Sequence, residues 1–171
     1  MKKFLLPALL SALLVACGST GTTTDSAGVE DRSGAGVATV TAPEMAGSGI
    51  AALTDPNNIL SRRSVYFDFD SFIVKSEFTP LVEAHARFLV QNPDIRMMIQ
   101  GNTDERGSRE YNLALGQKRA EAVKQALMLL GARESQIESV SLGEEKPRCF
   151  DATETCYAEN RRSDMLYTGE F

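Results

Sequence analysis

The chain has 171 residues, a formal net charge of −5 at pH 7 and an isoelectric point near 5.0. A chain of this length fits one domain plus a tail. Its acidic balance argues against a nucleic-acid-binding protein, because binding to phosphates needs a basic face.

The N-terminus has the pattern of an export signal. Lysines at positions 2 and 3 precede an apolar run over residues 4–15, and the small Ala16 is followed by Cys17. The run is too short to span a bilayer comfortably. We therefore expect residues 1–16 to be a signal peptide. Cys17 is then either a modified first residue of the mature chain or an incidental cysteine.

Residues 17–60 differ in composition from the rest of the chain. Gly, Ser, Thr and Ala dominate, and large apolar side chains are few. Such a segment buries too little surface to offset the entropy of ordering it. We expect a flexible tether with a root-mean-square span of roughly 35–40 Å, followed by one domain over residues 61–171.

Strand and helix patterns alternate within that domain. The predicted elements are, in order, a strand at 65–67, a helix at 78–89, a strand at 95–100, a helix at 108–130, and strands at 137–142 and 165–167. Apolar residues spaced three and four apart indicate the helices. This order predicts an α+β fold (an α/β sandwich) of βαβαβ type, with helices packed on one face of a mixed sheet.

Two cysteines, Cys149 and Cys156, lie near the C-terminus. In an exported chain such a pair favours a disulfide. The bond would close a loop of about eight residues and stabilise the fold by about 2.5 kcal/mol. A metal site is the alternative, but Asp151 and Glu154 are the only other candidate ligands in this segment.

The stretch from Gly101 to Arg119 is the most informative for function. A predicted strand ends in a glycine-bracketed loop that carries Asp104, and the following helix carries Asn112, Leu115 and Arg119 on one side. A carboxylate and a guanidinium around one small pocket suit a zwitterion better than bond-breaking chemistry. Arg119 is expected to lie half-sheltered beside the core. The alternative is that Asp104 and Arg119 simply pair with each other.

A family resemblance rests on the loop Gly101-Asn102-Thr103-Asp104-Glu105-Arg106-Gly107 and the helix after it. This segment closely resembles the cell-wall-binding segment of OmpA-like domains, and the whole chain resembles the Pal family of lipoproteins. The resemblance implies that Asp104 binds the ammonium, and Arg119 the carboxylate, of diaminopimelate in the peptidoglycan stem peptide. It also implies that the peptidoglycan site includes Phe69, Asp70, Arg106, Asn112 and Leu115.

The same resemblance implies a place in the cell envelope. Leu14-Val15-Ala16-Cys17 resembles a bacterial lipobox, so Cys17 is expected to be lipidated, and Gly18 after it favours the outer membrane. Members of the Pal family bind peptidoglycan non-covalently without being enzymes, bind TolB, and act in the Tol-Pal system at cell division. The implied partners are thus peptidoglycan and TolB, on the periplasmic side, with no cofactor or metal.

Three further features concern single positions or a short segment. Asn102 stands where many relatives have a histidine, and asparagine does not titrate near neutrality. The segment Asn160-Arg161-Arg162 matches a further family motif, but it is also what a solvated basic turn would look like. His85, on the apolar face of the first helix, is expected to be buried and hydrogen-bonded.

Two other functions stay open. A lipid-anchored cell-wall hydrolase would use paired carboxylates among Asp68, Asp70, Asp104 and Glu105, although nothing in the sequence fixes their separation. A module for another zwitterion, such as a free amino acid, would use the same charges as the wall-binding hypothesis. Neither a Gly-x-Ser-x-Gly motif nor a cysteine–histidine arrangement indicates catalysis.

Overall fold

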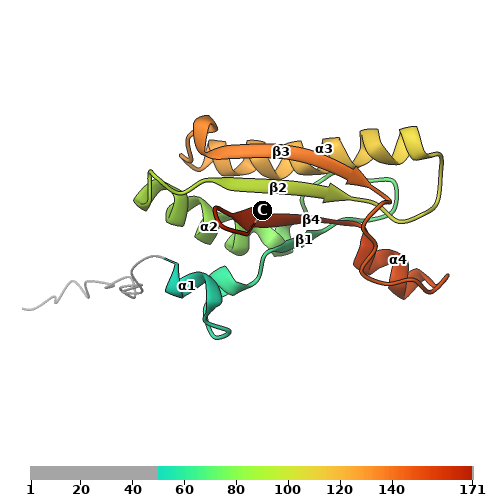
Figure 1. Cartoon of the computed structure of the whole chain (residues 1–171), viewed down its shortest axis with the longest axis horizontal. Helices are drawn as coiled ribbons and strands as arrows, with labels where there is room; N and C mark the ends of the chain where they lie inside the picture. The colour runs from blue at the N-terminus through green and yellow to red at the C-terminus, as the bar shows by residue number, and fades with distance from the viewer. Residues whose placement is uncertain (1–49, 171) are drawn as a thin grey trace, which may run out of the picture. The chain divides into compact units, whose positions relative to one another are not determined.

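The structure, a computed structural model, describes residues 50–170 (Figure 1). The predicted signal peptide, Cys17 and most of the predicted tether therefore lie outside the described residues. Within residues 50–170, no helix combines the length and the apolar character needed to cross a membrane.

The predicted strands and helices are present in the predicted order, with ends that differ by a few residues. The elements are α1 (Ala51–Thr54), β1 (Ser64–Tyr66), α2 (Thr79–Gln91), β2 (Met97–Asn102), α3 (Arg109–Leu129), β3 (Ile137–Gly143), α4 (Glu154–Asn160) and β4 (Arg162–Tyr167). Short 3-10 turns lie at Ile59–Ser61, Ser76–Phe78 and Glu134–Gln136. The sequence patterns did not predict α1 or α4.

The strands form one mixed sheet in the order β1-β4-β2-β3. β2 and β3 pair in parallel, and β4 lies antiparallel between β1 and β2. As a result β1, β2 and β3 all run in one direction. The last residues of β1 and β2 pair with the start of β4, and the end of β3 lies beside the end of β2. We refer to this side as the carboxyl end of the sheet. α2 and α3 lie behind the sheet in Figure 1, which confirms the predicted α+β fold with helices on one face.

Apolar side chains fill the space between the sheet and these two helices. The buried residues include Val65, Leu81, Val82, Phe88, Leu89, Met97, Ile99, Ala120, Val123, Leu127, Ile137, Met165 and Tyr167. Fully burying one such large apolar side chain contributes about 1.5–3 kcal/mol. The apolar stripes that indicated the two helices in the sequence are therefore what holds them to the sheet.

α3 approaches β2 closely because two glycines face each other. A Cβ atom on Gly101 would lie 1.8 Å from the carbonyl oxygen of Gly116, and a Cβ atom on Gly116 would lie 2.3 Å from Ser141 Oγ. The contact at Gly101 is with backbone, so a larger residue does not fit there without moving α3. This close approach brings the N-terminal half of α3 beside the carboxyl end of the sheet.

The folded domain begins before residue 61, so the predicted boundary between tether and domain was wrong. α1 and the turn at Ile59–Ser61 precede β1, and they place Leu53 and Leu60 in the core. Arg63 also donates a hydrogen bond of 2.8 Å to the carbonyl oxygen of Leu53. Two leucines in a polar segment were too few to indicate a folded region, but both side chains are buried.

His85 is buried and hydrogen-bonded, as expected. Its Nε2 lies 2.9 Å from the carbonyl oxygen of Arg62, and its Nδ1 lies 2.5 Å from the hydroxyl of Tyr167. Because a carbonyl only accepts, Nε2 carries the proton and Nδ1 accepts from Tyr167. Burial lowers the pKa of His85 to about 4, although the bond to Arg62 works in the opposite direction. The ring is therefore neutral at pH 7.

Candidate functional site at the carboxyl end of the sheet

A cavity of about 250 Å³ opens at the carboxyl end of the sheet. It is lined by Phe69, Asp70, Thr103, Asp104, Arg106, Gly107, Tyr111, Asn112, Leu115 and Arg119. The loops after β1 and β2 and the first half of α3 supply these residues. The structure thus brings together all seven residues assigned to the site from the sequence, and it adds Thr103, Gly107 and Tyr111.

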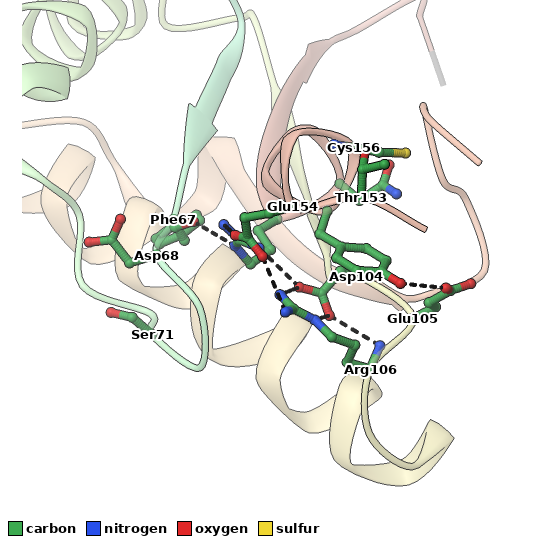
Figure 2. Close-up of polar contacts among 12 residues, drawn as sticks. Phe67, Asp68, Ser71, Asp104, Glu105, Arg106, Thr153, Glu154 and Cys156 are labelled. Atoms are coloured by element: carbon green, nitrogen blue, oxygen red, sulfur yellow. Dashed lines mark hydrogen bonds and ion pairs between the residues drawn. The ribbon is translucent and has the colours of Figure 1, made fainter. Parts of the chain in front are cut away.

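Asp104 lies in the loop directly after β2, with its carboxylate held by two arginines (Figure 2). Arg106 donates to both carboxylate oxygens, through its backbone N–H (3.1 Å), Nε (3.3 Å) and Nη2 (2.7 Å). Arg161 donates from Nη1 to Oδ2 at 3.2 Å. Burial works to raise the pKa of Asp104, but the bonds from Arg106 and Arg161 outweigh it, and the pKa lies below its ordinary value. Asp104 is therefore a buried carboxylate that stays ionised.

Arg119 is fully buried, with 0% of the residue exposed. The side chain is more deeply buried than the half-sheltered position expected from the sequence, because the loop after β1 folds over the guanidinium. Nε donates to the carbonyl oxygen of Ser71 (2.8 Å), Nη1 to that of Asn102 (3.0 Å) and Nη2 to that of Asp68 (3.2 Å). Burial, assisted by the nearby positive charge of Arg161, lowers the pKa of Arg119 to about 10. The side chain therefore remains charged at pH 7.

Asp104 and Arg119 do not form an ion pair with each other. Every salt bridge of Asp104 within residues 50–170 goes to Arg106 or Arg161. The three polar partners of the Arg119 guanidinium are neutral carbonyl groups. A guanidinium has five N–H donors, so these bonds leave two N–H groups of Arg119 for another acceptor. The alternative reading, in which the two residues simply pair, is therefore contradicted.

Arg106 lies between two aromatic rings at the mouth of the cavity. Its guanidinium carbon is 4.2 Å from the ring centroid of Phe69 and 4.4 Å from that of Tyr157. Stacking of a guanidinium on aromatic faces contributes about 0.5–1 kcal/mol at exposed sites. About a third of the Arg106 side chain (34%) is exposed. Of the two arginines that hold Asp104, this one is the more accessible.

The opposite wall of the cavity comes from the start of α3. Tyr111 donates a hydrogen bond to Asp70, which raises the pKa of the tyrosine. Asp70 has a positive φ of 54°, a conformation that aspartate tolerates better than most residues. Nothing in the sequence pattern pointed to Tyr111, which occupies the exposed first turn of the helix. The side chain of Leu115 forms the apolar part of this wall.

Asn112 connects the cavity to the loop after β3. Its Nδ2 donates to the carboxylate of Glu144. That loop is also tied to the end of β2, because the Thr103 N–H donates to the carbonyl oxygen of Gly143 (2.8 Å). Thr103 and Asn102 are buried, and their side-chain oxygens have no hydrogen-bond partner within the described part of the chain. The end of β3 and the loop after it are thus held beside the cavity by one side-chain bond and one backbone bond.

The segment Asn160-Arg161-Arg162 is not a solvated basic turn, because all three residues are buried. Asn160 Oδ1 accepts from the backbone N–H groups of Arg148 (2.8 Å) and Cys149 (3.2 Å). Arg162 forms a salt bridge with Asp164 (2.8 Å). Arg161 turns the other way, toward Asp104. The sequence alone did not decide between a family motif and a solvated turn, because two consecutive arginines do not indicate which carboxylates they will bind.

Cys149 and Cys156 form a disulfide in the structure, with a Cα–Cα distance of 5.2 Å. The thiolates are therefore not available as metal ligands. Within residues 50–170, no group of three or more His, Cys, Asp or Glu side chains is arranged to hold a metal ion. The bond ties the loop after β3 to α4, the short helix that precedes Arg161.

Comparison with known proteins identifies the family. The model of the OmpA family matches residues 66–161. A peptidoglycan-associated lipoprotein of Pseudomonas putida is 37% identical over 165 residues, covering 95% of both chains. The chain belongs to the OmpA family, among its peptidoglycan-associated lipoproteins. A member from Pasteurella multocida is 45% identical over 104 residues, which cover 61% of this chain and 69% of the relative.

Two solved structures show the same fold. The crystal structure of the peptidoglycan-associated lipoprotein from Burkholderia pseudomallei has 55% sequence identity and a TM-score of 0.67, and it covers 68% of this chain and 98% of that chain. The C-terminal domain of Helicobacter pylori MotB, at 18% identity and a TM-score of 0.58, shares the fold alone. None of these names describes an enzyme.

Proposed function

We propose that this chain is an outer-membrane lipoprotein that binds peptidoglycan non-covalently and thereby links the outer membrane to the cell wall. The observation that carries the proposal is the cavity whose walls hold one buried carboxylate and one buried guanidinium that do not neutralise each other. The names of the relatives, which are associated with peptidoglycan, support it.

The ligand group that fits this cavity is a zwitterion, such as the free end of diaminopimelate in the stem peptide. Because Arg119 is fully buried, the loop that carries Asp68 and Ser71 would have to open first. The two unused N–H groups of Arg119 would then donate to the ligand carboxylate, an acceptor suited to bidentate bonding by a guanidinium. Asp104 would accept from its ammonium. A peptide without this zwitterion would leave both buried charges without their partners, which is a physical basis for specificity.

Binding of an ammonium at Asp104 requires Arg106 to move. A carboxylate has about four acceptor positions, and the bonds from Arg106 and Arg161 already occupy them. The Arg106 guanidinium is partly exposed and is held otherwise by Phe69, Tyr157 and the exposed Glu154. The ligand ammonium would therefore take the place of Arg106, while the buried Arg161 stays.

The rest of the proposal concerns placement in the envelope. A lipid on Cys17 would hold the protein in the outer membrane, with residues 18–49 as a tether and the domain facing the periplasm. TolB is the proposed protein partner, in the Tol-Pal system that supports envelope integrity and outer-membrane constriction at division. The membership of the chain in the lipoprotein branch of the OmpA family supports these assignments.

The test is sedimentation of residues 18–171 with purified sacculi that contain diaminopimelate. Asp104→Asn keeps the shape of the side chain and removes its charge. Loss of one member of a buried, hydrogen-bonded charge pair at an interface weakens binding by about thirtyfold or more, so this variant should stay in the supernatant at protein concentrations that pellet the wild type. Asp94→Asn changes an exposed carboxylate outside the cavity and should pellet normally.

Three outcomes would contradict the proposal. Equal pelleting of wild type and Asp104→Asn would remove the aspartate from the site. Release of soluble muropeptides from the sacculi would indicate the hydrolase instead. If free diaminopimelate, at a concentration equal to that of diaminopimelate in the sacculi, prevents all pelleting, the protein is a receptor for free amino acids instead.

A further inference from the structure

α4 lies beside the cavity but contributes no residue to its lining. The helix begins at Glu154 after Thr153, whose side chain accepts from the backbone N–H of Cys156 (3.3 Å). Its start is fixed by the disulfide from Cys156 to Cys149. Figure 2 shows this helix next to Asp104 and Arg106, on the side away from α3.

Arg161, directly after α4, is held on three sides. Nη1 donates to Asp104 Oδ2 (3.2 Å), Nε to the carbonyl oxygen of Phe67 (3.1 Å), and Nη2 to Glu154 Oε1 (2.7 Å). Only 7% of its side chain is exposed. Since Phe67 directly follows β1, this one guanidinium connects the ends of β1 and β2 with α4.

Glu154 completes a ring of alternating charges. One of its oxygens binds Arg161, and the other lies 3.2 Å from Nη1 of Arg106. Both arginines in turn bind Asp104. Two carboxylates and two guanidinium groups therefore alternate, so each cation lies between two anions. The ring fixes the orientation of Asp104 and sets the resting position of Arg106.

We propose that Arg161 and Glu154 are positioning residues of the ligand pocket, which act through Asp104 and Arg106 without touching the ligand. This inference rests on the proposed function, in that the pocket is taken to bind a zwitterion through Asp104. Arg161 remains bonded to Asp104 when the ligand ammonium replaces Arg106, and Glu154 receives the displaced Arg106. The short helix after the disulfide is thus part of the binding machinery.

The first measurement needs no ligand. The titration of the Asp104 carboxyl group is followed by carbon-13 NMR in residues 18–171 of the wild type, Arg161→Met and Arg161→Lys. Arg106, Arg119, Arg161 and Glu154 are the charged groups around this carboxylate. Loss of the Arg161 charge should raise the pKa of Asp104, and lysine at this position should restore most of the decrease.

Arg162→Met is the matched control. Arg162 is the neighbouring residue, equally buried, and bonds to Asp164 and to the carbonyl oxygen of Lys146 instead of Asp104. This substitution should lower stability without changing the titration of Asp104. If Arg161→Met does not fold, the affinity of Glu154→Gln tests the ring instead, because the Glu154 side chain is 64% exposed and its loss leaves the core intact.

The second measurement is the affinity for a soluble diaminopimelate-containing muropeptide, by calorimetry. Arg161→Met and Glu154→Gln should each weaken binding by about tenfold, the effect of one charge-assisted hydrogen bond, with partial recovery in Arg161→Lys. An unchanged Asp104 titration together with an unchanged affinity would overturn the positioning role. Absence of wild-type binding would refute the proposed function, while the titration would still decide whether Arg161 controls Asp104.

Discussion

His85 links the stability of the domain to pH through its environment. The folded state keeps the ring neutral down to a pKa of about 4, whereas an unfolded chain protonates histidine near pH 6.5. Between these two values the unfolded state binds more protons than the folded state. The free energy of unfolding therefore falls as the pH is lowered through this window, and this contribution is fully present only above pH 6.5.

We expect this histidine to account for a loss of about 3 kcal/mol in the free energy of unfolding between pH 7 and pH 4. The measurement is urea unfolding at both pH values for the wild type and His85→Gln. The chain has a single histidine, so the substitution removes this titration alone. Titration of the carboxylates changes the free energy of unfolding equally in both proteins. If the variant loses as much stability as the wild type on acidification, the ring does not titrate as described.

At the level of single residues, the family resemblance predicted that Asp104 and Arg119 line one cavity. It did not predict which residues form hydrogen bonds or ion pairs with them. Arg161 lies 57 residues from Asp104 along the chain, and no local pattern indicates a contact at that distance. Tyr111 was missed for a similar reason. It reads as an exposed helical residue, and its bond to Asp70 joins positions 41 residues apart along the chain.

At the level of elements, the disulfide acts on a helix that is too short to be stable alone. α4 has seven residues, and isolated helices below about 12–15 residues are marginal in water. The seven-residue separation between Cys149 and Cys156 makes the closed loop worth about 2.5 kcal/mol. The bond and the side chain of Thr153 therefore hold the start of the helix together.

Replacement of both cysteines by alanine should lower the free energy of unfolding by about 2.5 kcal/mol. Amide hydrogen exchange should quicken most in residues 149–160, while α2 and β2 follow only the global change. Unfolding by urea and exchange measured by mass spectrometry together test this. Uniform acceleration across the domain, or no loss of stability, would show that the bond does not fix α4.

The long helices were predicted well, and the short helices α1 and α4 were not. α2 and α3 carry apolar stripes over several turns, because each must cover the sheet, and a stripe of this kind is visible in the sequence. α4 buries Cys156 and Asn160, which do not form such a stripe. Thr153 followed by Glu154 was a helix-start signal of the ordinary kind, and it would have indicated this helix.

At the level of the whole molecule, the domain depends on residues ahead of the predicted boundary. Leu53 and Leu60 are in the core, and burial of each contributes about 1.5–3 kcal/mol. A chain that starts at residue 61 should therefore be less stable than one that starts at residue 50 by roughly 3–6 kcal/mol. Thermal and urea unfolding of the two chains measures this difference.

Two substitutions separate packing from chain length. Leu53→Ala should cost about 2–4 kcal/mol, whereas Ile50→Ala should change little, since Ile50 is 65% exposed. Equal stability of the two truncated chains would show that α1 only rests on the surface.

The two ends of the sheet have different neighbours, and this has a mechanical consequence. Ile50 and Leu53 lie beside Ile95 and Tyr167, at the end of the sheet where β2 starts and β4 finishes, while the cavity is at the carboxyl end. A pull between residue 50 and a ligand in the cavity therefore runs along the strands. The hydrogen bonds that join β1 to β4 lie across that direction, so they bear the load together in shear instead of opening one after another.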